Sequence, residues 1–426
     1  MTPEVKKRIE QIRQGIVPEG YKKTKTDIVP ADWKESPIGK YIREYTEKTT
    51  IPNQYPVLTS ARTGLMLQTD YYSNRQVTTE DNVGYNVLPY GYITFRSRSD
   101  DGRFRFNKNR IIERGVISYF YPVFSFSEEV CHEYMLYLLN FSIYRRMYPY
   151  AEGTAQQVLS LKKLGQLKYS LPLVAEQKKI AKILATQDKA IELQERKIDE
   201  LKRFKKGYLE RMFPRKGQKV PEKRFPGFTD DWEQRKAIDI ADYSKGNGYS
   251  KGDLTDAGTP IILYGRLYTK YQFAISEVDT FAVPRNGAVY SQGNEVIVPA
   301  SGETAEDIAR ASAVEKSGVL LGSDLNILRP FDFINPLFLA LAISNGEPQK
   351  ELAKKAQGKS VVHIHNTDIQ EVTIAYPSRT EQDRIVSVFR QLDNLITLHQ
   401  RKLEEMKNQK KALMQLLLTG IVRVRL

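Results

Sequence analysis

Two long segments of the chain carry apolar residues at alternating spacings of three and four positions. In the first segment these residues are Ile180, Leu184, Ile191, Ile198, Leu201, Tyr208 and Met212. In the second they are Ile385, Phe389, Leu392, Ile396, Leu403, Met406, Leu413 and Leu417. A seam of this kind, sustained for about five heptads between densely charged faces, predicts a coiled coil. A long helix lying on a globular core is the alternative interpretation.

The two segments are copies of each other. Pro172 and Pro377 are 205 positions apart, and both are followed four residues later by Glu-Gln. Upstream of each proline, apolar residues at corresponding positions predict a short strand that ends in the proline; they are Leu164, Leu167, Tyr169 and Leu171, matched by Ile369, Val372, Ile374 and Tyr376. Trp33 and Trp232, 199 positions apart, mark the start of each copy.

The chain is therefore two copies of one plan, each with a variable block before its strand and helix. The variable blocks, about residues 34–165 and 233–370, share little sequence. We predict an α+β fold with two mixed α/β globular domains separated by a long antiparallel coiled coil, related by a pseudo-twofold internal repeat. The predicted parts are an N-terminal helix and lead-in (1–31), a first domain (32–171), a central helix (172–214), a linker and second domain (215–376), and a C-terminal helix and tail (377–426).

The repeat also predicts contacts between the two long helices. A helix of about 36 residues is roughly 54 Å long, so the pair is expected to hold the two globular domains apart as a rod of fixed length. Gln194 and His399 occupy equivalent seam positions, so an antiparallel pair brings them together. Our hypothesis is a central polar layer that fixes register; polar residues tolerated at a partly open layer are the alternative. RQGIV (13–17) resembles LTGIV (418–422), so the N-terminal helix is expected to pack beside the C-terminal one.

Composition narrows the partners. The net charge of +14 favours a polyanion, and nucleic acid is favoured over a membrane surface because no basic helix has a bulky apolar face. No apolar stretch approaches the roughly 18 to 20 residues of a membrane helix. The single cysteine, Cys131, excludes an intrachain disulfide and a cysteine-based zinc site, and a reducing cytoplasm is the expected setting.

Taken together, these features resemble those of the specificity subunits of Type I restriction-modification systems. The resemblance rests on the proline, the Glu-Gln pair and the heptad helix with its KKGYL run, on RFPGFTDDWEQRK (224–236), and on the SGET (301–304) and GKSVVHI (358–364) runs. It covers nearly the whole chain, and the doubled order of the motifs is more specific than any one of them.

The resemblance implies a function in phage defence through DNA methylation and restriction. Each variable block is then a target recognition domain that reads a few base pairs of double-stranded DNA, and the two half-sites are separated by an unspecified gap whose length the helices set. Two modification (methyltransferase) subunits dock on the helices and bind S-adenosylmethionine. Restriction subunits use ATP and Mg. This chain binds no cofactor and catalyses nothing alone.

Two other classes of function are the alternatives to DNA recognition. An autonomous enzyme needs signatures that are missing: Asn335-Pro336-Leu337 lacks the second proline of an amino-methyltransferase loop, and no phosphate-binding glycine loop occurs. His363 and His365 alternate along a predicted strand and could bind a metal with a third ligand, but no cysteine or acidic cluster flanks them. A coiled-coil scaffold without DNA is the second rival, disfavoured by the charge and by the elaborate variable blocks.

Candidate DNA contacts are basic, aromatic and polar residues in turn-like stretches, because arginine can bond guanine at two points and lysine more often binds phosphate. SDDG (99–102) is predicted as a hairpin turn between arginine-bearing strands. In the first block the candidates are Arg62, Tyr71, Asn74, Arg75, Arg96, Arg98, Arg103, Arg145 and Arg146. In the second they are Tyr264, Arg266, Tyr268, Ser301, Glu303, Thr304, Lys355 and Lys359. For the SGET run, capping of a helix that starts at Ala305 is the alternative role.

Overall fold

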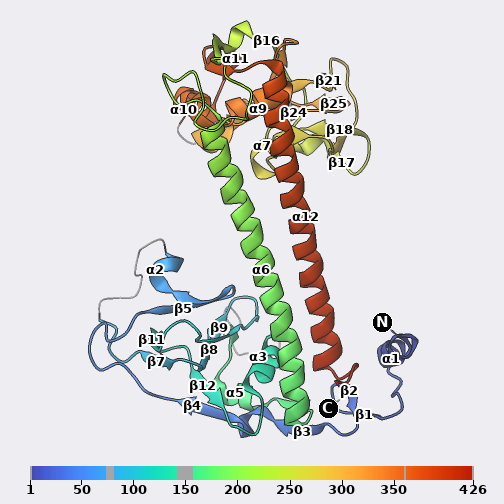
Figure 1. Ribbon diagram of the computed structural model, residues 1–426. Coiled ribbons are helices and arrows are strands. Elements are labelled where there is room, and N and C mark those ends of the chain that lie inside the picture. The colour runs from blue at the N-terminus through green and yellow to red at the C-terminus, as the bar shows by residue number, and fades with distance from the viewer. Residues whose placement is uncertain (1, 73–80, 142–156, 359–360, 425–426) are drawn as a thin grey trace. The chain divides into compact units, whose positions relative to one another are not determined.

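The computed structural model describes residues 2–72, 81–141, 157–358 and 361–424. The chain divides into two compact units (Figure 1). Unit 1 comprises Met1–Leu193 and Leu403–Leu426, and unit 2 comprises Gln194–Lys402. Each unit holds one globular domain and part of both long helices, α6 (Val174–Met212) and α12 (Arg379–Leu418).

The domain of unit 1 is built on a four-stranded antiparallel sheet in the order β10-β8-β12-β4. These strands are β10 (Phe106–Lys108), β8 (Ile93–Phe95), β12 (Val123–Phe126) and β4 (Ile42–Tyr45). Further pairs are β5 (Leu58–Ala61) with β6 (Gly64–Leu67), β7 (Asn86–Pro89) with β11 (Arg114–Ile117), and β9 (Arg98–Ser99) with β13 (Gln157–Val158). Short helices are α2 (Gln68–Tyr71), α3 (His132–Phe141) and α5 (Leu161–Gln166). The rings of Phe95, Phe106 and Phe124 pack together in the core.

The domain of unit 2 contains two five-stranded mixed sheets. The first, in order, is β16 (Ala241–Lys245), β26 (Leu325–Pro330), β22 (Glu295–Pro299), β24 (Ser312–Val314) and β19 (Ala274–Ile275). The second is β17 (Leu254–Thr255), β20 (Phe281–Ala282), β18 (Thr259–Ile262), β25 (Ser317–Leu321) and β21 (Tyr290–Gln292). Helices are α7 (Arg266–Thr269), α8 (Ala305–Ile308), α9 (Pro336–Ile343), α10 (Gly346–Lys355) and α11 (Asn366–Gln370). The pairs β18–β25 and β19–β24 are parallel, so the two domains differ in topology.

A repeated frame surrounds these different domains. In unit 1, β3 (Lys34–Pro37) pairs with β14 (Lys168–Leu171), and in unit 2, β15 (Glu233–Lys236) pairs with β28 (Thr373–Tyr376). The first strand of each pair directly follows a buried tryptophan, Trp33 or Trp232. The second strand leads through the repeated proline into α6 or α12. The strand predicted before each proline is therefore confirmed over its last four residues, whereas Leu164 and Ile369, at the start of the predicted strands, lie in the helices α5 (Leu161–Gln166) and α11 (Asn366–Gln370). The tryptophan markers are core residues.

The repeated glutamine joins each globular domain to its long helix by hydrogen bonds. Gln177 Nε2 donates to the Pro172 carbonyl at 2.9 Å, and its Oε1 accepts from the backbone N–H of Cys131 at 2.8 Å. Gln382 makes the same two bonds, to Pro377 at 2.9 Å and from Asn335 at 2.8 Å. Cys131 and Asn335 directly precede α3 and α9. One buried amide thus fixes the start of the long helix and the start of a domain helix together.

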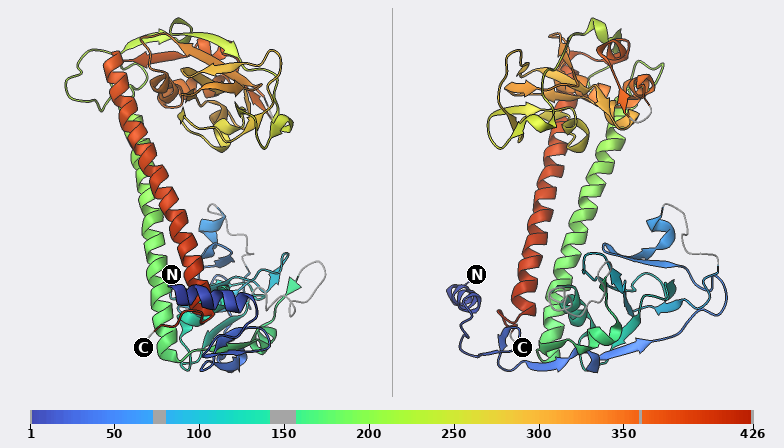
Figure 2. Two further views of the ribbon diagram at one scale, coloured as in Figure 1. Left: turned by 90° about the vertical axis from the view of Figure 1, so that its right-hand side faces the viewer. Right: turned by 180° about the vertical axis from the view of Figure 1, so that it is seen from behind.

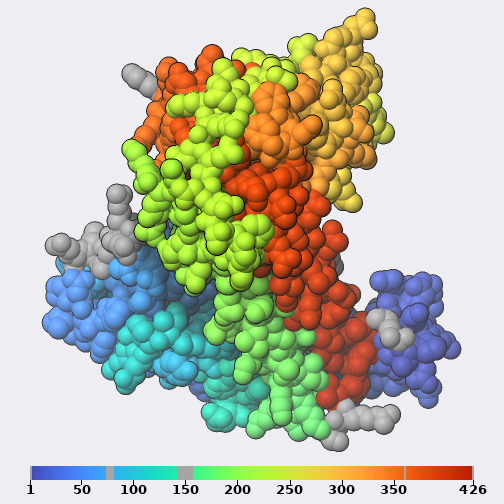
Figure 3. Space-filling model, turned by 45° about the horizontal axis from the view of Figure 1, so that its top comes forward, coloured from blue at the N-terminus to red at the C-terminus, as the bar shows by residue number. Residues whose placement is uncertain are grey.

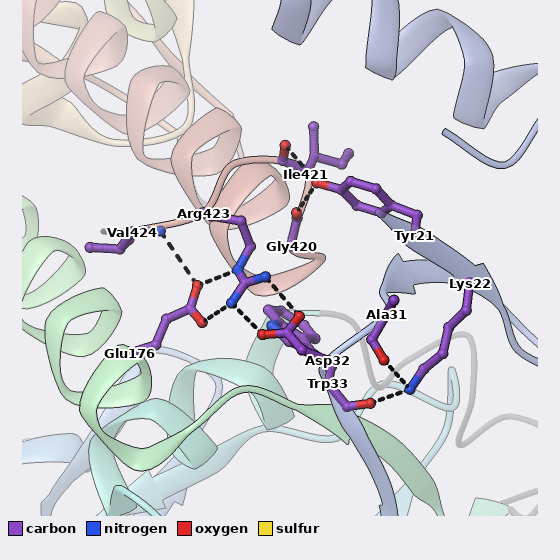
Figure 4. Close-up of polar contacts among 10 residues, drawn as sticks. All are labelled: Tyr21, Lys22, Ala31, Asp32, Trp33, Glu176, Gly420, Ile421, Arg423 and Val424. Atoms are coloured by element: carbon purple, nitrogen blue, oxygen red, sulfur yellow. Dashed lines mark hydrogen bonds and ion pairs between the residues drawn. The ribbon is translucent and has the colours of Figure 1, made fainter. Parts of the chain in front are cut away.

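The repeated glutamate binds an arginine in both units, but the arginines reach it by different routes. In unit 2, Glu381 forms two 2.8 Å bonds with Arg224 of the linker after α6. In unit 1, Glu176 binds Arg423 of the C-terminal tail at 2.8 and 2.7 Å, and Arg423 also bonds Asp32. Figure 4 shows this junction. The hydrogen bonds that Arg423 donates raise the pKa of its guanidinium; the bond to Glu176 has the larger effect and the bond to Asp32 the smaller one.

The junction of unit 1 joins the N-terminal segment to the C-terminal tail. The Tyr21 hydroxyl donates to the Gly420 carbonyl at 2.8 Å, and Arg8 of α1 (Pro3–Arg13) donates to the Ile421 carbonyl at 2.7 Å. A Cβ on Gly420 would lie 2.5 Å from Pro30 Cδ, and its φ of +75° also favours glycine. The lead-in contains β1 (Tyr21–Lys23) paired with β2 (Ile28–Pro30). The N-terminal helix was predicted beside the C-terminal helix; these bonds join it to the tail that follows that helix.

Within each unit the two long helices are antiparallel neighbours (Figures 1 and 2). In unit 1, Gln187 Nε2 donates to the Met406 carbonyl at 3.2 Å, and Asp188 pairs with Lys410. In unit 2, Lys205 pairs with Asp393 at 2.5 Å. Gln194 Nε2 lies 2.8 Å from the His399 carbonyl oxygen and 2.9 Å from its ring Nδ1. The predicted meeting of Gln194 and His399 is confirmed; their role in register remains a hypothesis.

The apolar residues of the predicted seam pack partly against the partner helix and partly against the globular domains. Ile180 and Leu184 belong to the buried core of the first domain, and Ile385 and Phe389 belong to that of the second. Ile191, Ile198 and Ile396 are also buried, whereas Leu201, Leu403 and Met406 are only half-buried. At the N-terminal end of each helix the seam residues thus pack on a globular core as well as beside the end of the partner helix. None of the described helices is long and apolar enough to cross a membrane.

Candidate nucleic-acid interface

The loop after β8 holds most of the described arginine candidates of the first domain. SDDG lies in the loop that joins the antiparallel strands β8 and β10, so the predicted hairpin is present. The expectation that the arginine-bearing stretches beside the turn pair with each other is wrong, because β9, with Arg98, pairs with β13. Instead, Asp101 organises the turn: its carboxylate accepts from the Ser99 hydroxyl at 2.9 Å and from the Arg103 N–H at 3.1 Å. The pairing across the whole loop is between β8 and β10.

Arg62 and Arg103 meet at this turn. Arg62 Nη2 bonds the Asp101 carboxylate at 2.7 Å, and Arg103 Nε lies 4.0 Å from the same group. Both arginine side chains remain largely exposed, at 64% and 69%. Asp101 therefore gathers two predicted candidates without removing them from solvent.

Arg98 lies against an exposed aromatic turn that the sequence analysis did not single out. Its guanidinium is 4.5 Å from the centre of the Phe120 ring, and the Tyr119 ring lies 4.0 Å from that of Phe120. The Ser97 hydroxyl donates to the Phe120 carbonyl at 2.6 Å and fixes the turn to the arginine loop. The run SYFYP (118–122) was the available signal.

Arg96 and Tyr71 lie at the edge of the same surface. Burial raises the pKa of Tyr121, and the positive charge of Arg96 acts in the opposite direction; Arg96 and Tyr72 both lie near Tyr121. The Tyr71 and Tyr72 rings pack edge to face, 4.7 Å apart. We call the set Tyr71, Tyr72, Arg96, Arg98, Tyr119 and Phe120 the aromatic–arginine surface. Flat rings beside guanidinium groups are suited to contacts with bases and sugars.

Five predicted candidates lie outside the described residues. They are Asn74, Arg75, Arg145, Arg146 and Lys359. Their roles as DNA contacts stay predictions.

In the second domain, Arg266 is committed to an internal ion pair. Its side chain is only 9% exposed and bonds Asp279 at 2.5 Å, Gln272 at 3.1 Å and the Glu277 carbonyl at 3.0 Å. Lys270 also binds Asp279, and its bond, followed by that of Arg266, lowers the pKa of the Asp279 carboxyl. These bonds favour a structural role for Arg266.

Tyr264, Tyr268 and the SGET run lie close together. The two tyrosine rings are 6.2 Å apart. Burial is the main cause that raises the pKa of Tyr268, and the neighbouring Tyr264 and the negative charge of Glu303 act in the same direction. Thr304 caps α8: its hydroxyl accepts from the Asp307 N–H at 3.1 Å. The capping alternative is confirmed for Thr304, while Glu303 remains exposed beside Tyr268.

Ser301 and the histidines make internal contacts. Ser301 Oγ lies 3.1 Å from His363 Nδ1 across the pair β23 (Ser301–Gly302) and β27 (Val362–His363). The strand predicted to carry both histidines is wrong beyond His363, because His365 already serves as the N-cap of α11. Among the described residues, no group of three histidine, cysteine or acidic residues is placed to hold a metal ion.

Lys355, in the last turn of α10, pairs with Glu371, and the bond to that carboxylate raises its pKa. The described candidates therefore separate into two groups. Arg62, Arg96, Arg98, Arg103 and Tyr71 remain accessible in the first domain, and Tyr264, Tyr268 and Glu303 remain accessible in the second. Arg266, Ser301, Thr304 and Lys355 are held in contacts within the protein.

Comparison with known proteins agrees with the doubled frame. The family model described as the Type I restriction modification DNA specificity domain matches twice, at residues 22–203 and 229–408. The chain belongs to the Type I restriction-modification DNA specificity family. Each match contains one variable block with most of the long helix that follows it, so the repeat inferred from the two prolines is a repeat of specificity domains.

Individual relatives align along nearly their full length. The Type I restriction enzyme MjaVIII specificity subunit of Methanocaldococcus jannaschii is 22% identical, with 97% of this chain and 98% of the relative covered. A putative Type I restriction enzyme MjaX specificity subunit of the same organism is also 22% identical, at 96% and 97% coverage. The chain is thus a DNA-recognition member of the family, similar in extent to these specificity subunits.

Solved structures show the same fold. The S subunit of a Type I restriction-modification system from M. genitalium has a TM-score of 0.55 at 14% identity, covering 94% of this chain and 99% of that one. A chain from a Type I restriction-modification structure, solved for complex assembly and conformational transition, has a TM-score of 0.56 at 15% identity, covering 92% and 99%. The predicted α+β class with a repeated specificity domain is confirmed.

Proposed function

We propose that this chain reads a bipartite DNA target for a Type I restriction-modification complex. Each recognition domain binds one short half-site, and an unspecified gap separates the two. The observation that carries the proposal is the doubled specificity domain, in which one frame holds two domains of different sheet topology. Domains of different topology present different side chains to DNA, so the two half-sites are expected to differ in sequence.

The chain acts by recognition and positioning, not by catalysis. Modification subunits bind S-adenosylmethionine and methylate adenine, and restriction subunits with ATP and Mg cut DNA. The described exposed side chains support DNA contact through arginine and aromatic groups. The complex works in the cytoplasm, where its DNA targets lie.

Two modification subunits dock on the long helices. Leu193 and Leu398 are equivalent under the repeat, and both are exposed large apolar residues of the long helices, at 55% and 63%. Surface of both helices is visible on one face of the molecule (Figure 3). Exposed leucines at repeated positions are expected of a surface that two identical partners cover.

A methylome tests the proposed function. The chain is expressed with its neighbouring modification subunit in a host free of adenine methylation, and modified adenines are mapped across the genome. The expected result is a split motif with a fixed gap, which disappears when this chain is omitted. A stable complex that methylates no such motif contradicts the proposal.

A DNA-binding assay distinguishes the proposed function from that of a coiled-coil scaffold that does not bind DNA. Contacts with phosphates release counterions, so the affinity of a specificity subunit for DNA falls steeply with salt. A scaffold has no such dependence, because it has no DNA affinity to lose.

A further inference from the structure

Two basic clefts lie between the recognition domains and the long helices, one inside each unit. The cleft in unit 1 has a volume of about 520 Å³ and the cleft in unit 2 about 930 Å³. One wall of the first carries Lys407, Lys410 and Lys411 from α12. One wall of the second carries Lys202, Lys205 and Lys206 from α6.

The two clefts are equivalent under the internal repeat. Adding 205 to Lys202, Lys205 and Lys206 gives Lys407, Lys410 and Lys411, so both clefts present the same K-x-x-K-K run. The cleft beside the first domain takes its lysines from α12, the long helix of the second repeat. The cleft beside the second domain takes its lysines from α6, the long helix of the first repeat.

The middle lysine of each run is a structural anchor. Lys410 pairs with Asp188 and lies 5.8 Å from the ring centre of Tyr137. Lys205 pairs with Asp393 at 2.5 Å and lies 5.4 Å from the ring centre of Phe273. A lysine from one helix, an aspartate from the other and an aromatic ring from the domain thus hold each cleft in shape.

The last lysine of each run is available to a ligand. Lys206 and Lys411 are exposed, and the described residues show no carboxylate bonded to either. In unit 1, Arg105 adds a further cation: desolvation in the cleft lowers its pKa, and the charge of Asp188 opposes that effect. A concave site with several cations and few acceptors attracts an anion.

We propose that the K-x-x-K-K clefts hold the sugar-phosphate backbone of duplex DNA on either side of the gap. The inference rests on the proposed function and deepens it. Base contacts specify sequence, and phosphate contacts position the protein without specifying it. Two domains that differ in topology but act on one duplex need the same positioning contact twice. The repeated helices, and not the variable blocks, are where such a contact can be encoded twice.

The test compares two matched double variants in complex with the modification subunit. Lys206→Gln with Lys411→Gln removes one charge from each cleft and leaves both lysine–aspartate anchors in place. Lys197→Gln with Lys402→Gln is the control, because these exposed lysines are also equivalent under the repeat, lie on the same helices and line neither cleft. Fluorescence anisotropy measures affinity for target and non-target duplexes across a salt series.

The plot of log affinity against log salt has a negative slope, and the cleft variant is expected to make it shallower by about 2, since each lost phosphate contact removes about 0.9. Target and non-target duplexes should lose affinity by the same factor, and the methylated motif should be unchanged. The control should keep the wild-type slope, and circular dichroism should show both variants folded.

Three outcomes overturn the assignment. A wild-type slope in the cleft variant shows that the lysines do not touch phosphate. A loss of modification-subunit assembly at an unchanged slope shows that the clefts bind protein. An altered target motif shows that the lysines contact bases. If the wild-type complex methylates no split motif, the proposed function itself fails, which is a result separate from these three.

Discussion

The repeated Pro-x-x-x-Glu-Gln motif has a specific task at each residue. The glutamine bonds the proline carbonyl and a domain N–H, and the glutamate binds an arginine that arrives after the opposite long helix. Glu381 is 1% exposed and Arg224 12%. A carboxylate this deeply buried needs its partner, because an isolated buried charge is strongly unfavourable.

Arg224→Met should therefore destabilise unit 2 by about 3–5 kcal/mol, since it leaves Glu381 buried without its cation. Thermal unfolding of the full chain measures the effect. The control is Arg215→Met, which removes an arginine that is 72% exposed and paired with Glu222; the expected loss is below about 1 kcal/mol. Adding Glu381→Met to Arg224→Met should restore part of the stability. Equal losses for both arginines would show that the buried pair has no special weight.

Arg98 is the described arginine best placed to read a base, because Phe120 and the Ser97 bond fix its position. Arg98→Gln should weaken binding of the target duplex by about 1–3 kcal/mol, with a smaller loss on a non-target duplex. Anisotropy on both duplexes measures the ratio. Arg43→Gln is the control, because Arg43 is also exposed in the first domain but bonds the carbonyls of Lys40 and Ile42. An equal loss on both duplexes would assign Arg98 to phosphate instead.

At the scale of elements, the long helices and the strands before them follow from periodicity and repetition alone. The aromatic–arginine surface does not, because Arg98 joins a strand with residues 157–158, some sixty positions further along the chain. The SDDG run has turn composition, yet Asp101 bonds groups inside its own loop and Arg62 from another one. Local sequence specifies a turn there but not which strands the turn connects.

The seam illustrates the same limit within a helix. Heptad spacing predicts which residues are buried, and Ile180, Leu184, Ile385 and Phe389 are buried. It does not predict what covers them, because a partner helix and a sheet both require an apolar stripe. The repeated lysines of the clefts were visible in the sequence, but their aromatic neighbours Tyr137 and Phe273 come from variable blocks.

The polar layer of Gln194 and His399 is expected to define helix register at a cost in stability. Gln194→Leu should lower the free energy of unfolding by about 1 kcal/mol, since it removes both bonds to His399. Gln194→Leu with His399→Leu should recover that stability but relax the register. A zero-length carbodiimide cross-link between Lys205 and Asp393, which pair at 2.5 Å, reports the native register by mass spectrometry. A double variant with an undiminished cross-link and an unchanged oligomeric state would contradict the hypothesis.

At the scale of the whole molecule, each unit contains the same glutamate–arginine contact, but the arginine comes from a different part of the chain. In unit 2 the arginine that binds Glu381 is Arg224, which lies in the continuous chain between α6 and the second domain. Unit 1 is closed by bonds between Arg423, Glu176 and Asp32 and by the Tyr21–Gly420 contact. The chain passes from one unit to the other only along α6 and α12. Helix length is therefore the variable expected to set the gap between half-sites.

Deleting one heptad from each helix tests this dependence. Removing residues 191–197 and 396–402, which are equivalent under the repeat, shortens each helix by about 10 Å at 1.5 Å per residue. With about 3.4 Å per base pair, the gap should shrink by about three base pairs, or the target should be lost if the changed helical phase of DNA prevents simultaneous contact. Deletion from α6 alone is the control: it mismatches the seam and should abolish methylation. A methylome in which the double deletion retains the wild-type gap would show that the helices do not measure it.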